Sequence, residues 1–238
     1  GGERVAGTAP EAPRVGPRWG GRGIIADGRE WEGGNPEGCW KLFEAERSYA
    51  ESLFQDLAGD TEGSLRALER ALSFKSDYPP AILSMGSVEY QRGRKEEGRR
   101  LLVSLVEYPD ATPDLEELVD EAGMFLIQQK EYEDGLALYG AATARFPATS
   151  MFHAGLGCCA GHMDRHEEAL DAARRALELE PGNQAYVNDL GWSLVLAGNL
   201  DEALETLKRA VAMDPSDELA RENLARCKTR ILEQAKKR

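Results

Sequence analysis

The residues best suited to chemistry lie in one short stretch, HAGLGCCAGHMDRH at 153–166, which holds three histidines and two adjacent cysteines. Cysteine sulfur and histidine nitrogen are common zinc ligands. On a helix with 100° per residue, Cys158 and His162 lie about 40° apart on one face, whereas His153 lies about 140° from Cys158. Zinc usually takes three or four protein ligands, so two on one face do not complete a site. We predict no metal and no cofactor.

A metal-responsive module remains an alternative interpretation of this stretch. It would use Cys158 and His162, joined by Cys159 and His166. Other chemistry has weaker support, because the sequence contains none of the patterns G-x-x-x-x-G-K-[ST], H-E-x-x-H or G-x-S-x-G, and no G-x-G-x-x-G after a strand. We therefore predict that the chain is not an enzyme.

Composition narrows the class of protein. The 238 residues are 42% hydrophobic and 30% charged, with a formal net charge of -13 that opposes binding to a phosphate backbone. No apolar run approaches the roughly 18 residues of a membrane-spanning helix. The four cysteines lack the regular spacing of a disulfide scaffold. We expect a cytoplasmic protein with reduced thiols that binds neither nucleic acid nor a membrane.

Residues 1–34 differ from the rest of the chain. They are rich in Gly and Pro and show no helical or strand periodicity, which predicts a flexible arm. Four large apolar residues, Trp19, Ile24, Ile25 and Trp31, leave open the alternative that the arm docks on the body or on a partner. Asn35 can cap a helix that begins at Pro36, and helical periodicity continues from there to the end.

A period of 34 residues runs through this helical part. Pro147, Pro181 and Pro215 recur at that spacing. Small residues keep the same period, in the series Gly123, Gly157 and Gly191; Gly135, Ala169 and Ala203; and Ala142, Ala176 and Ala210. The segment 109–113 shifts the register by three residues, since Gly86 and Gly123 are 37 apart. The pattern predicts five units, at 45–78, 79–112, 116–149, 150–183 and 184–217.

Each unit reads as two helices joined by a tight turn. Small residues facing each other let the two helices approach closely. The turn carries Gly or a polar residue, and acidic residues open the second helix, where the helix dipole favours them. After Pro215, residues 218–238 keep an apolar stripe, which predicts a helix that covers the exposed end of the stack.

With these units the sequence resembles the tetratricopeptide repeat family, most closely in YVNDLGWSLVLAGNLDEALETLKRAVAMDPSD at 186–217. The resemblance implies an all-α fold, a right-handed superhelical α-solenoid of about five helix-turn-helix repeats with a C-terminal capping helix. The repeat domain would span 35–217. In this family the first helices of the units line a concave groove that binds peptides or helices of partner proteins.

The resemblance also places particular side chains on that groove. They are Tyr49, Leu53, Leu83, Ser87, Tyr90, Asp120, Met124, Ile127, Cys158, His162, Asn188, Trp192 and Val195. One branch of the family holds acidic C-terminal tails with Lys, Arg and Asn. Here the corresponding positions are Tyr49, Leu53, Ser84, Glu117 and Glu121, which cannot supply those cations.

We therefore predict a non-catalytic scaffold or adaptor. Its partner would be a peptide or amphipathic helix of another protein, flanked by basic residues that meet Glu117, Asp120 and Glu121. An alternative is a regulatory or targeting segment of a larger, enzymatic protein. The exposed ends of a repeat stack also allow self-association into a homo-oligomer.

Overall fold

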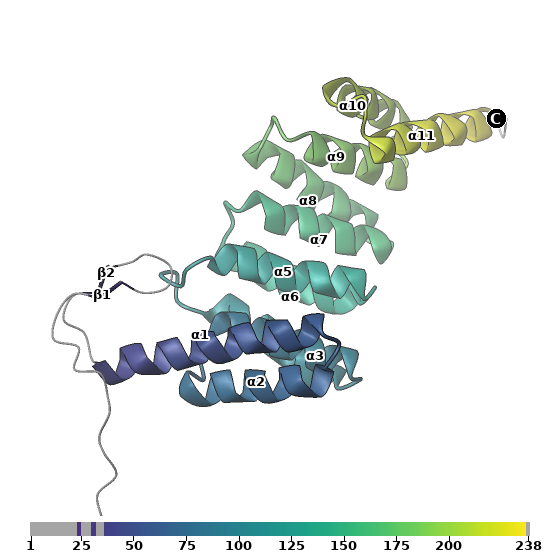
Figure 1. Ribbon diagram of the computed structural model, residues 1–238. Coiled ribbons are helices and arrows are strands. Elements are labelled where there is room, and N and C mark those ends of the chain that lie inside the picture. Colours follow the sequence, from purple (N-terminus) through teal and green to yellow (C-terminus); the bar gives the residue numbers. More distant parts are fainter. Residues whose placement is uncertain (1–22, 25–29, 32–35, 237–238) are drawn as a thin grey trace, which may run out of the picture.

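The structure is a computed structural model that describes residues 23–24, 30–31 and 36–236 (Figure 1). Over residues 36–236 the chain forms five helix pairs and a final single helix. The pairs are α1 (Pro36–Leu57) with α2 (Thr61–Phe74), α3 (Pro79–Gln91) with α4 (Lys95–Ser104), α5 (Leu115–Gln128) with α6 (Tyr132–Arg145), α7 (Ser150–His162) with α8 (His166–Leu179), and α9 (Gln184–Leu196) with α10 (Leu200–Met213), followed by α11 (Glu218–Lys236). A short 3-10 helix, η1 (Leu105–Glu107), follows α4. Each pair stacks on the next as an α-solenoid, which confirms the predicted fold class.

The predicted arm is described at four residues only. Gly23–Ile24 forms β1 and Glu30–Trp31 forms β2, and the two strands pair antiparallel, with Gly23 opposite Trp31. The sequence pattern predicted no strand here. Ile24 and Trp31, two of the apolar residues that interrupt the Gly- and Pro-rich composition, each lie on one strand. The other arm residues, Trp19 and Ile25 among them, lie outside the described part of the chain, so the flexible arm stays a prediction.

The turn inside each helix pair has the same backbone conformation in all five units. Its residue with positive φ is Gly59, Gly93, Lys130, Asp164 or Gly198. These positions repeat the period of the sequence, including the longer step from Gly93 to Lys130. The left-handed backbone conformation costs little free energy for glycine and more for other residues, because the other residues carry a Cβ atom. The recurrence shows that the turn geometry, rather than the residue type, is what the repeat maintains.

Close helix approach explains the recurring small residues. A Cβ atom added to Gly98 of α4 would lie 2.7 Å from the carbonyl oxygen of Gly86 on α3. Backbone meets backbone at this point, so no side chain could move aside to make room. The second unit departs from the pattern at Leu105, where a small residue is usual: α4 ends at Ser104, and the buried Leu105 begins η1.

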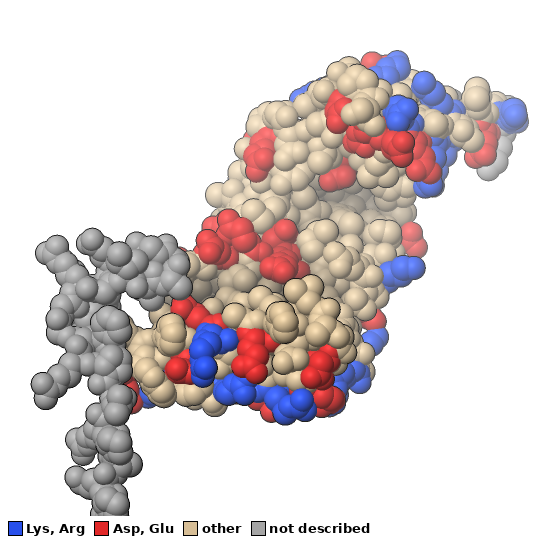
Figure 2. All heavy atoms as spheres, in the orientation of Figure 1, with Lys and Arg blue, Asp and Glu red and all other residues tan. Residues whose placement is uncertain are grey.

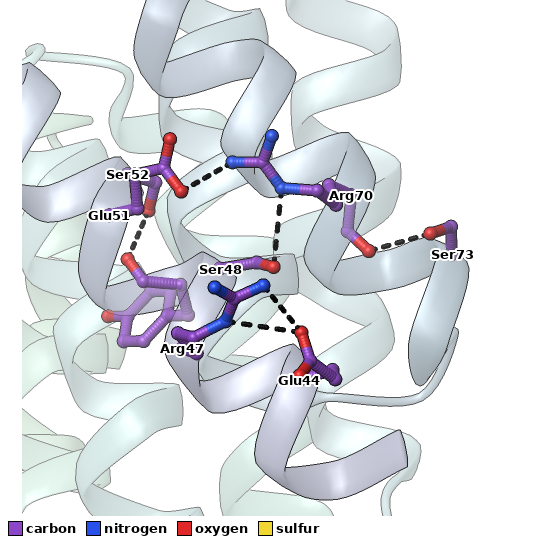
Figure 3. Close-up of polar contacts among 8 residues, drawn as sticks. Glu44, Arg47, Ser48, Glu51, Ser52, Arg70 and Ser73 are labelled. Carbon is purple, nitrogen blue, oxygen red and sulfur yellow. Dashed lines mark hydrogen bonds and ion pairs between the residues drawn. The ribbon is translucent and has the colours of Figure 1, made fainter. Parts of the chain in front are cut away.

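Helix α1 begins at Pro36, as predicted, and is longer than the first helix of any other described pair. It packs on α2 through the small residues Ala45, Ser48 and Ser52, which are buried. Polar contacts reinforce this interface: Arg70 of α2 lies 2.6 Å from Glu51, and its Nε donates to Ser48 Oγ at 3.4 Å (Figure 3).

The opposite face of α1 carries larger apolar groups than its buried face. Phe43 is 54% exposed, Phe54 71% and Leu57 88%. These positions recur at helical spacing, so they form one outward stripe. The first helix of the stack thus leaves apolar surface open to solvent.

At the other end, α11 covers the last pair, as predicted. Ala220 and Cys227 of α11 are fully buried, and Asn223 donates from its amide nitrogen to Asn188 Oδ1 of α9 at 3.1 Å. Arg230 also donates to the carbonyl oxygen of Val195 at 3.1 Å. Residues 237 and 238 lie outside the described residues. Among the helices that the structure describes, none has the length and apolar character needed to cross a membrane.

Candidate partner-binding groove

The first helices of the second to fifth pairs, α3, α5, α7 and α9, contain no lysine or arginine. They do contain acidic residues: Glu116, Glu117, Asp120 and Glu121 on α5, Asp189 on α9, and a buried Glu89 on α3 that pairs with Arg94. In the face seen in Figure 2, acidic groups lie in the hollowed middle, whereas Lys and Arg gather toward the ends and the rim. These helices therefore present a surface of apolar and acidic groups.

Two hollows open along the first helices. The N-terminal hollow has a volume of about 310 Å³ and lies between α1, α3 and α5. Four predicted groove residues line it, Leu53, Leu83, Ser87 and Met124, together with Asp56 and Glu121. Met124 is 43% exposed, so a large apolar side chain is available to a partner here.

The C-terminal hollow, between α7, α8 and α9, has a volume of about 260 Å³. The predicted groove residues Cys158, His162 and Trp192 line it, and Tyr186 and Asp189 complete its polar and aromatic part. The ring of His162 stacks on that of Tyr132, with centroids 4.1 Å apart, which fixes one side of the hollow.

The packing of neighbouring helices raises the pKa of two groups in the C-terminal hollow, both of which keep solvent-exposed surface. Desolvation raises the pKa of the Asp189 carboxyl to about 6, an effect that hydrogen bonding to Asn188 opposes and the negative charge of Asp217 adds to. Desolvation also raises the pKa of the Cys158 thiol, with a further contribution from Asp189. A thiol with a raised pKa is mostly protonated at neutral pH, so Cys158 is a weak nucleophile and a weak metal ligand.

Three further predicted groove residues are buried and line neither hollow, so for them the prediction is wrong. The Val195 side chain is fully buried and packs with Leu194 and Leu207. Asn188 is 3% exposed and bonds to Asn223, whereas Tyr90 is 3% exposed and donates to Asp134 Oδ2 at 2.8 Å. Contacts within the chain thus occupy all three side chains.

The remaining three predicted residues, Tyr49, Asp120 and Ile127, are half-buried beside the hollows. Tyr49 packs edge-on against Tyr78 with centroids 5.7 Å apart. Asp120 accepts a hydrogen bond from the Tyr139 hydroxyl at 3.0 Å, and burial raises the pKa of its carboxyl. Ile127 packs against the central core. Their exposed parts border the groove without lining either hollow.

The histidines and cysteines of 153–166 do not converge. His153 bonds to the carbonyl oxygen of Pro147 at 3.0 Å, Cys159 is fully buried in the core, and His166 lies at the next turn, 4.0 Å from Asp164. In the described part of the chain, no three His, Cys, Asp or Glu side chains are grouped so that they could hold a metal.

The sequence analysis missed Asp189, Tyr186, Ser193 and Leu196, which line the C-terminal hollow. Asp189 and Leu196 lie at helical spacing from Trp192 and share its face. The prediction chose Asn188 and Val195, each one residue earlier, and one residue turns a side chain by 100° around the helix. The helical spacing of Asp189, Trp192 and Leu196 was the sequence signal that could have identified these lining residues.

Comparison with known proteins agrees with this architecture. Tetratricopeptide repeat family models match residues 121–184 and 162–228. Small glutamine-rich tetratricopeptide repeat-containing protein 2 of Mycosarcoma maydis is 26% identical over 102 residues, which are 43% of this chain and 29% of that protein. The FK506-binding protein-like protein of Homo sapiens is 31% identical over 80 residues, 34% of this chain and 23% of that protein. The matches thus span less than a third of each relative.

Solved structures share the fold at low sequence identity. A tetratricopeptide repeat protein from Parabacteroides merdae superposes with a TM-score of 0.60 at 14% identity, over 82% of this chain and 76% of that one. MamA from Desulfovibrio magneticus RS-1 has a TM-score of 0.54 at 19% identity, over 74% and 97%. YrrB, a TPR protein with an unusual peptide-binding site, has a TM-score of 0.52 at 19% identity, over 74% and 89%.

Residues 121–228 thus contain tetratricopeptide repeats, and the resemblance to this family seen in the sequence is confirmed. Proteins of this family are generally scaffolds for protein interactions.

Proposed function

We propose that this chain is a non-catalytic scaffold or adaptor that binds an apolar, basic peptide or amphipathic helix of a partner protein along its first helices. The observation that carries the proposal is the composition of α3, α5, α7 and α9, which combine two hollows with acidic side chains and no lysine or arginine. A basic segment meets opposite charge on such a surface, whereas an acidic segment meets like charge. The predicted cytoplasmic location fits the exposed free thiols of Cys39 and Cys158.

Two exposed methionines, one inside and one outside the hollows, provide the test. Met124 is 43% exposed in the N-terminal hollow, and Met213, at the end of α10, is 40% exposed and lines neither hollow. Proteins captured from a native extract by the immobilised chain should be retained at least about tenfold less by Met124→Glu, because a buried Met contributes about 1.5–3 kcal/mol and the new charge opposes burial.

Met213→Glu, the control, should retain the same proteins as the unchanged chain. The bound segment is then located by crosslinking, and its peptide is titrated by fluorescence anisotropy. Equal loss in both variants, or a mapped segment that is acidic, contradicts the proposal.

A second reading places these repeats within a larger protein, as a regulatory or targeting segment. It is supported by the relatives, of which the matched regions form only 29% and 23%. Sequencing the complete reading frame tests it, and an adjoining catalytic domain is the result that favours it.

Self-association is a further part of the proposal, with the outward face of α1 as the contact between two copies. A two-fold axis across α1 in an antiparallel pair sets Phe43 of one copy against Phe54 of the other, so large apolar groups meet and are removed from water. The stripe runs along the helix from Phe43 to Leu57, all of it exposed in a single copy.

We expect sedimentation velocity to give a mass above 26.1 kDa that rises with concentration. The double variant Phe54→Glu, Leu57→Glu should sediment at 26.1 kDa. Leu219 and Leu232 of α11 are 57% and 64% exposed, so changing both to Glu is a matched control at the other end and should leave the mass unchanged. A chain that remains at 26.1 kDa across the concentration range refutes this contact.

A further inference from the structure

The C-terminal hollow combines one acidic group with an otherwise uncharged lining. Its walls are small or apolar at Ala154, Gly157, Ala173, Ala176 and Leu196, and aromatic at Tyr186 and Trp192. Apart from His162, Asp189 is the one charged or readily charged side chain among the residues around it. Such a space fits an apolar stem that ends in a polar, positively charged group.

Asp189 has no cationic partner within the described residues. None of the ion pairs found among them includes it, and the neighbouring negative charge of Asp217 makes its ionised form less favourable. Tyr186, on the same wall, experiences the negative charges of Asp189, Asp120 and Glu180. The local field is therefore negative, and the Asp189 carboxylate, which keeps exposed surface within the hollow, is attracted to a bound cation.

Trp192 supplies a second attraction for a cation. The Arg226 guanidinium lies 5.8 Å from the centre of its ring and is held by Glu222 at 2.6 Å. The ring thus already accepts one positive charge within the distance of a cation–π contact. Because Arg226 pairs with Glu222, it leaves the Asp189 charge uncompensated.

We infer that this hollow binds the side chain of a lysine or arginine of the partner, with its alkyl stem against the apolar walls and its charged group at Asp189 and the rings of Trp192 and Tyr186. The inference rests on the proposed function, which it makes specific by naming the anchoring residue of the bound segment. A neutral apolar side chain in the same place would bury the Asp189 carboxylate without a partner, and an acidic side chain would add a like charge.

The groups that face Asp189 determine how binding depends on pH. Helix α7 contributes Cys158 and His162, α9 contributes Tyr186 and Asn188, α8 contributes the uncharged Ala173 and Ala176, and Asp217 lies in the link to α11. Since burial raises the pKa of Asp189 to about 6, the carboxyl is charged at pH 7.5 and about nine-tenths protonated at pH 5. Cation binding should therefore be about tenfold weaker at pH 5.

The test uses small probes, so that it does not depend on a partner being known. The full chain, labelled with ¹⁵N, is titrated with n-butylammonium, n-propylguanidinium or the neutral 1-butanol, and amide shifts of 154–162 and 186–196 are followed. We expect a cation to bind at least tenfold more tightly than 1-butanol at pH 7.5, and to lose about tenfold at pH 5. Asp189→Asn should remove both the preference and the pH dependence.

Two controls test whether the cation preference and its pH dependence are specific to Asp189. Asp171→Asn, on an exposed residue of α8 outside the hollow, should change nothing. Histidines gain charge in the same pH range, so the series is repeated in His162→Gln, where the pH dependence should persist. Asp189→Asn is expected to fold at least as stably as the unchanged chain at neutral pH, because burial disfavours the carboxylate that it replaces.

Cation binding that is absent, equal to that of 1-butanol, or unaffected by Asp189→Asn overturns the inference. The proposed function fails separately: it is refuted when Met124→Glu and Met213→Glu retain partners equally, whatever the small probes do. If partner retention depends on Met124 but probe binding is unaffected by Asp189→Asn, the groove still binds a partner and the proposed cation site is refuted.

Discussion

Replacing Gly155 with alanine is expected to lower the free energy of unfolding by about 1–3 kcal/mol, the usual effect of overfilling a packed core. The added Cβ would lie 2.2 Å from Cζ of the Tyr139 ring. That ring is fully buried, and its hydroxyl is held by Asp120, so it cannot move aside without losing a hydrogen bond. The helical preference of alanine, worth about 1 kcal/mol over glycine, offsets only part of the cost.

Gly140 provides the matched control, because it also lies within a helix and a Cβ added there meets nothing within 4 Å. Gly140→Ala should raise the free energy of unfolding by about 0.5–1 kcal/mol. Urea unfolding followed by circular dichroism measures both variants. If the two substitutions shift the midpoint in the same direction, the Tyr139 ring does not fill the space that the structure assigns to it.

Tyr139 shows what a repeat pattern can and cannot predict. The 34-residue period predicted small residues at Gly123 and close packing between helices, because such spacing is a property of one chain segment. It did not predict that Gly123 and Gly155, from neighbouring units, both make room for one tyrosine. A Cβ atom added to Gly123 or to Gly155 would lie 2.3 or 2.2 Å from Cζ of the Tyr139 ring. Tyr139 stands where the next units have Ala173 and Leu207, so its fit depends on three-dimensional contacts between units.

The candidate groove was predictable to about one helical position. Met124, Cys158 and Trp192 line the hollows as the family pattern implied, whereas Asn188 and Val195 turn into the core. A shift of one residue rotates a side chain by 100°, so an error that is small along the sequence exchanges surface for core. The pKa of Asp189 was beyond the reach of the pattern altogether, because desolvation arises from helices that are distant in sequence.

The start of α1 illustrates a different limit of prediction from the repeat pattern. The period placed the first unit at residue 45, whereas the helix begins at Pro36. The capping residues Asn35 and Pro36 predicted this start from local chemistry alone. The 34-residue period and the helix cap therefore gave information on different features of the helix. The repeat defines where helices pair, and the cap defines where hydrogen bonding begins.

A chain that ends at Asp217, without α11, is expected to lose about 3 kcal/mol or more of the stability of its last helix pair. Helix α11 buries Ala220 and Cys227 and covers a cluster that includes Leu194 and Leu207, and each large apolar side chain exposed to water costs about 1.5–3 kcal/mol. Removing Asn223 also leaves the buried amide of Asn188 without its partner.

Because neighbouring repeats stabilise one another only through their shared interfaces, the loss should concentrate in α9 and α10 and fade toward α3. Hydrogen exchange should show α9 and α10 opening first, while amides in α5 and α6 keep their protection. A chain that ends at Leu232 loses residues 233–236, which are exposed, together with the two residues after them, and should exchange as the complete chain does. Equal protection of α9 in the two shortened chains would mean that α11 rests on the stack without supporting it, and that the apolar stripe of 218–238 has another purpose.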